Sequence, residues 1–142
     1  MSKLKILVIS SLLFYISLGA DPLSDEEIKS FNIKDLYNTS FDKRMNTFRI
    51  IKELGYREKY KQELEKAVLY MLKHKDIFYK RTGIQGENMF HLGNSEVHEL
   101  ILKNAEDTQY ESGNQFLYFR ASIMEYLSYE LEKARKKLLL CK

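Results

Sequence analysis

The stretch Asn114–Leu140, with the sequence NQFLYFRASIMEYLSYELEKARKKLLL, decides the fold of this chain. It contains neither Gly nor Pro, and its apolar residues recur at helical spacing. The main row consists of Phe116, Ile123, Leu127, Leu131, Ala134 and Leu138, widened by Leu117 and Met124 on one side and by Phe119 and Tyr126 on the other. At about 100° per residue, this stripe covers roughly half of the helix circumference. So broad a stripe needs neighbours on two sides, and it predicts the central helix of a bundle.

A second long helix is predicted from Tyr56 to about Arg81, because its apolar residues also recur at helical spacing. This stripe consists of Tyr60, Leu64, Ala67, Met71 and Phe78. Gly55 favours a break before this helix, since Gly is costly inside a helix, and the alternative is one long helix that runs through Gly55. The two long stripes match in length, so we expect the two helices to pack against each other in antiparallel orientation.

Shorter helices are expected to cover the remaining flanks. Weaker patterns and capping residues predict three of them, from Ser24 to about Tyr37, from Phe41 to Leu54 and from about Ser95 to Ala105. The sequence contains no strand pattern of any length. The predicted fold is therefore all-α, an antiparallel bundle of four to five helices with long helices at about 56–81 and 114–140, in a single domain over residues 21–142.

Residues Met1–Ala20 have the composition of a secretory signal peptide. Lys3 and Lys5 precede the apolar run Ile6–Leu18, and small residues follow where a signal peptidase would cleave. The alternative is an uncleaved membrane anchor, but the apolar run is too short to span a bilayer comfortably. We therefore expect a secreted or periplasmic protein with no membrane span after signal cleavage.

Charge and motif content exclude several functional classes. Two of the 23 basic side chains, Lys3 and Lys5, lie in the predicted leader, so the others nearly balance the 20 acidic ones and give no basic face for nucleic acid. The three histidines lack metal-ligand spacing, and no nucleophile, phosphate-loop or calcium-loop motif occurs. We therefore expect no enzyme activity, metal or cofactor. The one cysteine, Cys141, is expected to be a free thiol, with an intermolecular disulfide as the alternative.

Two polar residues have unusual positions. His74 lies within the apolar arc of one predicted long helix, and Arg120 lies within that of the other. Glu63 and Glu130 lie on or near the same arcs, so the four side chains should meet if these helices pack together. One hypothesis is a ligand-binding pocket formed by Arg120 and His74, in which Arg120 binds an anion. The alternative is a structural role, in which the arginine is paired or reaches solvent at the end of the bundle.

The stretch Thr82–Asn94 is the longest without helical periodicity and is predicted to be a loop. Glycines surround Met89, Phe90 and Leu92, and apolar side chains in a loop suit recognition of another protein. The alternative is that Phe90 and Leu92 fold back over the end of the bundle. The sequence thus favours an exported helical bundle that acts as a protein–protein interaction module. The alternative function is a carrier of a small ligand in the bundle interior.

Overall fold

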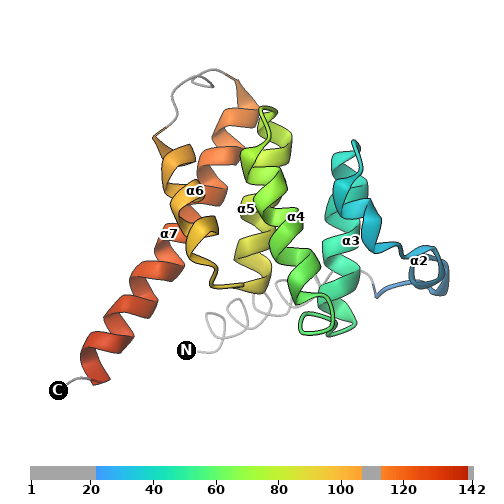
Figure 1. Ribbon diagram of the computed structural model, residues 1–142, viewed down its shortest axis with the longest axis horizontal. Coiled ribbons are helices and arrows are strands. Elements are labelled where there is room, and N and C mark those ends of the chain that lie inside the picture. Colours follow the sequence, from blue (N-terminus) through green and yellow to red (C-terminus); the bar gives the residue numbers. More distant parts are fainter. Residues whose placement is uncertain (1–21, 107–112, 141–142) are drawn as a thin grey trace, which may run out of the picture.

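The computed structural model describes residues 22–106 and 113–140, which form six α-helices and one 3-10 helix. In chain order these are α2 (Asp25–Ser30), η1 (Ile33–Tyr37), α3 (Phe41–Glu53), α4 (Lys61–Lys73), α5 (Ile77–Phe90), α6 (Ser95–Ala105) and α7 (Asn114–Leu140). No strand occurs in these residues, and from α3 to α7 successive helices run in alternating directions (Figure 1). The predicted all-α antiparallel bundle is confirmed. The predicted signal peptide and Cys141 lie outside the described residues.

Polar side chains start several helices where the sequence predicts. Ser24 Oγ accepts a hydrogen bond from the Glu27 backbone N–H (3.2 Å), and the Glu27 carboxylate accepts one from the Ser24 N–H (2.9 Å), so the expected capping box is present. Asn94 caps α6 by accepting hydrogen bonds from two N–H groups of its first turn. Gly55 follows α3 with a φ of 67°, a left-handed conformation that favours Gly, so the predicted break is also confirmed.

The predicted long helix over residues 56–81 is wrong. The α-helix ends at Lys73 and a new one begins at Ile77, so α4 and α5 fold back against each other. At the break, the Asp76 carboxylate accepts a hydrogen bond from the Phe78 backbone N–H (2.7 Å) and caps α5. Asp side chains compete for backbone N–H groups in this way, which favours helix starts over helix interiors. The apolar spacing continues across this turn by coincidence, so periodicity alone does not reveal it.

The predicted loop Thr82–Asn94 is also wrong, because most of it belongs to α5. This helix is buried on several sides, so its sequence lacks the polar face that produces a helical period. Its glycines mark close helix contacts: a Cβ at Gly86 would lie 2.6 Å from Phe48 Cζ, and one at Gly83 would lie 3.1 Å from Met71 Cβ. Only the last four residues of the stretch form the connection to α6.

The centre of the bundle is α5 and not α7 as predicted. It packs against α3, α4 and α7, and Figure 1 shows it in the middle of the fold. The fully buried core around it includes Leu36, Phe48, Ile51, Leu64, Val68, Ile84, Val97 and Ile101. No described helix combines the length and the hydropathy that crossing a membrane requires.

The predicted helix Asn114–Leu140 is confirmed, but it packs on one side only. Its buried row consists of Phe116, Phe119, Ile123 and Tyr126, and it packs mainly against α5. Leu117 and Met124, which were expected to contact a second neighbour, are largely exposed. Beyond Glu130 every described residue of α7 is exposed, and Figure 1 shows this half of the helix projecting away from the bundle.

Candidate functional site

The structure does not bring the predicted ligand-binding residues together. His74 lies in the turn after α4, where its ring stacks on Tyr79 with centroids 3.9 Å apart. Arg120 is exposed on α7, and its guanidinium lies 4.9 Å from the centre of the Phe116 ring. No hydrogen bond, ion pair or ring contact joins His74 and Arg120 among the described residues.

The wider polar cluster expected around this pair is likewise not formed. Glu63 is exposed on α4, and Glu130 is partly buried on α7, where it pairs with Lys133 at 3.3 Å. The prediction failed because it relied on a helix over residues 56–81 that packs along the whole of α7. Without that helix, no neighbouring helix covers the side of α7 that carries Arg120. Its side chain is therefore one of the cations on the surface of α7.

The predicted partner-binding loop is corrected as well. Met89 and Phe90 belong to the last turn of α5, and Phe90 and Leu92 are buried in the core. The Phe90 ring packs on Phe48 with centroids 5.7 Å apart. Met89 is half-buried beside Met45, in a surface hollow between α3 and α5. The sequence also allowed the alternative that Phe90 and Leu92 fold back over the end of the bundle, and the structure agrees with it. These two side chains are therefore not available to a partner.

A buried arginine, Arg44, is a feature that the sequence reasoning missed. Its side chain is fully buried and donates hydrogen bonds to the carbonyl oxygens of Asn38 (2.8 Å) and Thr39 (3.0 Å) and to Thr82 Oγ1 (3.2 Å). The guanidinium lies 3.9 Å from the centre of the Tyr79 ring. Burial lowers the pKa of Arg44, and these partners hold its charge without a carboxylate in direct contact. Arg44 thus ties the η1–α3 connection to α5, which is a structural role.

A second missed feature is Glu87, whose side chain on α5 is only 3% exposed. Its Oε1 accepts a hydrogen bond from the Gly93 backbone N–H at 3.3 Å. Burial raises the pKa of Glu87, and the neighbouring charge of Glu130 raises it further. Nearby, Tyr126 Oη lies 2.7 Å from His98 Nδ1, and burial also raises the pKa of Tyr126. A substrate cannot reach so buried a carboxyl group, so this cluster is better explained as a polar part of the core.

Metal binding and anion binding have little support in the described residues. No group of three His, Cys, Asp or Glu side chains has the geometry of a metal site there. A hollow of about 420 Å³ between α4, α5 and α6 is lined partly by Lys73, Lys80 and Lys103. Lys73 is paired with Glu96 at 2.6 Å, Lys73 and Lys103 are exposed, and Lys80 is buried. Exposed lysines bind anions weakly, so this hollow is not the strongest candidate.

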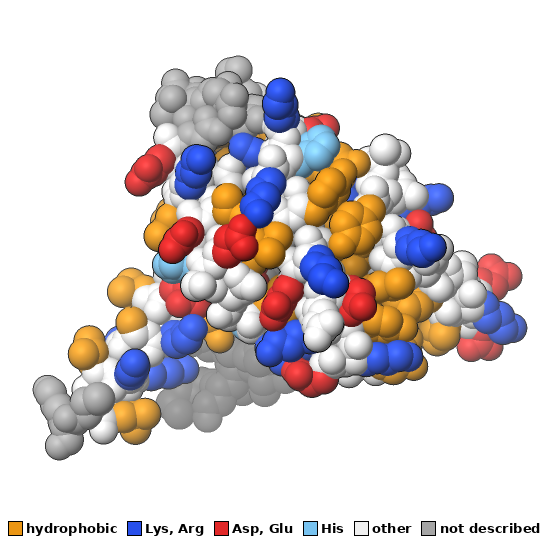
Figure 2. Space-filling view, viewed as in Figure 1, with side chains coloured by type: hydrophobic (Ala, Val, Ile, Leu, Met, Phe, Trp, Pro, Cys, Tyr) orange, Lys and Arg blue, Asp and Glu red, His pale blue; other side chains and the backbone are white. Residues whose placement is uncertain are grey.

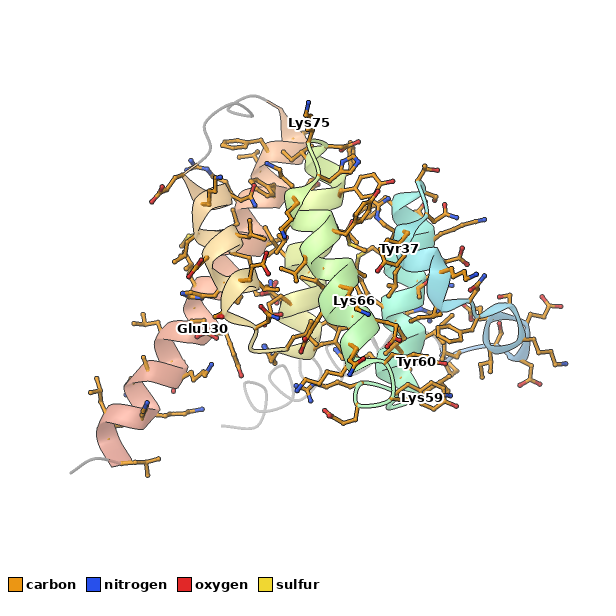
Figure 3. All side chains as sticks on the ribbon, in the orientation of Figure 1. Tyr37, Lys59, Tyr60, Lys66, Lys75 and Glu130 are labelled. Carbon is orange, nitrogen blue, oxygen red and sulfur yellow. The ribbon has the colours of Figure 1, made fainter. Side chains whose placement is uncertain are left out.

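Aromatic side chains gather on the face formed by η1 and α4. The Tyr37 and Tyr70 rings lie 5.3 Å apart, and Tyr70 also contacts His74 at 5.9 Å. Figure 2 shows hydrophobic side chains on this side of the molecule, and Figure 3 places Tyr37 and Tyr60 there. These rings contact one another and are only partly exposed, so much of their apolar surface is already covered.

Among the described residues, the large apolar side chains that are more than half exposed all lie on α7, and four of them form a row on its outer face. Leu117, Met124, Leu131 and Leu138 follow one another at intervals of seven residues, and they are 65%, 62%, 73% and 71% exposed. Between them lie Arg120, Leu127 and Ala134, again seven residues apart. A seven-residue repeat with apolar residues at its first and fourth positions is the pattern of a helix that pairs with another helix. We call this row, from Leu117 to Leu138, the outer seam.

The outer seam is distinct from the row of α7 that packs on the bundle. Phe119 and Tyr126 of the buried row lie two positions after Leu117 and Met124, which turns them by about 200° at helical geometry, and Phe116 and Ile123 lie one position before them, at about 100°. Leu127 lies at the border between the two rows, because it is partly buried against the core. The stripe that was read from the sequence as one broad surface is therefore two surfaces. One faces α5 and the other faces solvent.

No family model, curated protein or solved structure matches this chain.

Proposed function

We propose that this protein is a protein–protein interaction module that binds through the outer seam of α7. The observation that carries the proposal is the exposure of Leu117, Met124, Leu131 and Leu138 at seven-residue intervals. Burying a leucine or methionine side chain contributes about 1.5–3 kcal/mol. Four such side chains in one row therefore offer a large free energy to a partner helix.

The shape of the seam favours a helical partner over a membrane. Helices that lie in a bilayer surface present a broad apolar face, whereas a row with only the first and fourth positions apolar is narrow. Beyond Glu130 the projecting half of α7 is net basic, with Lys133, Arg135, Lys136 and Lys137 against Glu132, which pairs with Arg135 at 3.5 Å. The narrowness of the apolar row, and not the charge of this segment, therefore favours a helical partner.

The alternative function, a carrier of a small ligand, has lost its proposed site. It required Arg120 to line the bundle interior, but this side chain is exposed. The ligand was expected to lie between the two long helices. In the structure α5 lies at this place in the bundle, and its Ile84 is fully buried. The interaction module needs no interior space, so we favour it.

We also propose that the protein acts outside the membrane that exports it. The support is the composition of Met1–Ala20, with two lysines ahead of an apolar run. Terminal sequencing of the protein from its own source tests this part. A chain that begins at Ala20 or Asp21 is expected, and a chain that retains Lys3 and Lys5 would contradict export with cleavage.

Site-specific photo-cross-linking tests the binding surface. A photoreactive side chain at Leu131 lies on the seam, and the same group at Lys136 provides a matched control because it is similarly exposed but lies off the seam. We expect discrete cross-links to a polypeptide from position 131 and few from position 136. Equal cross-linking from both positions, or none from position 131, would show that the seam is not a binding surface.

A further inference from the structure

We infer that the partner of the outer seam is a second copy of this chain, paired in antiparallel orientation through the projecting half of α7. The inference rests on the proposed function and adds the identity and the orientation of the partner. It uses the part of the helix from Leu127 onward. Leu127 is partly buried against the bundle, and beyond Glu130 every described residue of α7 is exposed, so both copies can approach there (Figure 1).

The repeat fixes how the two helices would meet. In an antiparallel pair, first-position residues of one helix face fourth-position residues of the other. Placing Leu131 against the partner's Ala134 also places Leu127 against the partner's Leu138. Each contact occurs twice by symmetry, and the smaller Ala134 lies opposite a leucine both times. The central layers are therefore filled without two large side chains competing for one space.

Charged residues beside the seam complement each other in this register. Glu130 and Lys137 occupy the same flanking position of successive repeats, just before Leu131 and Leu138. Glu130 pairs with Lys133 of its own helix at 3.3 Å, and in the antiparallel pair it also lies beside the partner's Lys137, which gives two further attractive contacts in the dimer. Figure 3 places Glu130 where α7 leaves the bundle, so its side chain lies at the border of the proposed interface.

Arg120 argues against the parallel arrangement. If the seams paired in parallel along their whole length, Arg120 would face the partner's Arg120 at a fourth position between Leu117 and Met124. Two like charges in such a layer repel, and burying them without a partner is costly. In the antiparallel register Arg120 lies beyond the end of the partner helix. The arginine that interrupts the apolar arc thus limits pairing to the projecting half.

Sedimentation equilibrium of the full chain, from micromolar to millimolar concentration, tests the inference. We expect a reversible monomer–dimer equilibrium. Leu131→Ser with Leu138→Ser should raise the dimer dissociation constant at least about 100-fold, because each dimer loses four buried leucines. The matched control is Leu139→Ser with Leu140→Ser, which removes two leucines that are 59% and 88% exposed but lie off the seam. Equal weakening by both pairs, or a monomer throughout, would overturn the inference.

Charge reversal tests the orientation. Glu130→Lys should weaken the dimer by about 10-fold, and adding Lys137→Glu should restore it, because the two changes exchange the partners of each contact. In a parallel dimer Glu130 would instead face the partner's Arg135, so rescue by Arg135→Glu and not by Lys137→Glu would overturn the antiparallel arrangement. Circular dichroism melting of each variant shows that the bundle itself remains folded.

The inference and the proposed function fail in different ways. A chain that stays monomeric but cross-links from position 131 to a different polypeptide would overturn the second-copy inference and leave the proposed function standing. A monomeric chain without cross-links from position 131 would overturn both.

Discussion

Substituting Gly86 by Ala is expected to destabilise the protein, although Ala is the better helix former. Gly86 lies inside α5, where the sequence alone predicted a loop. In a loop at negative φ or on an exposed helix face, Gly→Ala would be neutral or stabilising. In this structure the missing Cβ is what allows α5 to approach Phe48 of α3, so the substitution tests the packing of the central helix directly.

Two terms of opposite sign set the size of the effect. Replacing Gly by Ala in a helix stabilises it by about 1 kcal/mol. The new Cβ would lie 2.6 Å from Phe48 Cζ and 3.1 Å from Val68 Cγ2. Carbon atoms pack at about 3.5–4.0 Å, so the Phe48 ring must move by roughly 1 Å. Phe48 is fully buried against Phe90, and overpacking of this kind costs about 1–3 kcal/mol. With the cost near its upper end, we expect a net loss of about 1–2 kcal/mol.

Urea unfolding of Gly86→Ala, Phe48→Leu and the double variant measures this coupling. Leucine removes the edge of the ring that the new Cβ would meet, so the double variant should lose less stability than the sum of the single losses. The reasoning would be refuted if Gly86→Ala stabilised the protein or if the two losses simply added. Either result would mean that α5 and α3 do not cross at Gly86.

Three further substitutions test other parts of the structure. Arg44→Met should cost about 3–5 kcal/mol in urea unfolding, because it leaves the buried partners of the guanidinium without a donor; unchanged stability would place Arg44 at the surface. Burial raises the pKa of Glu87 in the folded state, so its contribution to stability is present at acidic pH and is lost as the pH rises through the raised pKa. Glu87→Gln should therefore gain more stability over the wild type at pH 8 than at pH 4, and a constant difference would contradict a buried carboxyl group. Leu131→Ser with Leu138→Ser should change the melting temperature of the dilute protein little, since both side chains are exposed, whereas a large drop would mean that the bundle covers them.

Features that depend on nearby residues could be read from the sequence. The capping box at Ser24 and the left-handed Gly55 involve only a few neighbouring positions, and both are present. The helix Asn114–Leu140 was predicted with its bounds, because it is long, uninterrupted and amphipathic. Its two rows were recognised as well, but periodicity gives only the width of an apolar stripe. Whether each side is covered depends on the other helices.

The central helix could not be found in this way. A helix that is buried on most sides has no polar face, and α5 also contains Gly83 and Gly86, which usually indicate a loop. The break at Asp76 was missed for the opposite reason, since apolar spacing continued across it. Because of these two errors, His74 and Arg120 were predicted to lie together in the interior of the bundle.

The buried charges were missed for a related reason. Arg44 and Glu87 become buried through contacts with residues far away in the chain, such as Thr82 for Arg44. The one available signal was that Arg44 lies on the apolar side of its helix, four residues before Phe48.

Hydrogen exchange of the α7 backbone amides between Leu131 and Leu138 tests the central claim, that the outer seam is a binding surface, most directly. In dilute protein every described residue of this projecting segment is exposed, so its amides should exchange rapidly, as in an isolated helix. As the concentration of the full chain rises, we expect these amides to become protected in the wild type but not in the Leu131→Ser, Leu138→Ser variant. Exchange that is independent of concentration, or protection that the variant retains, would contradict the claim.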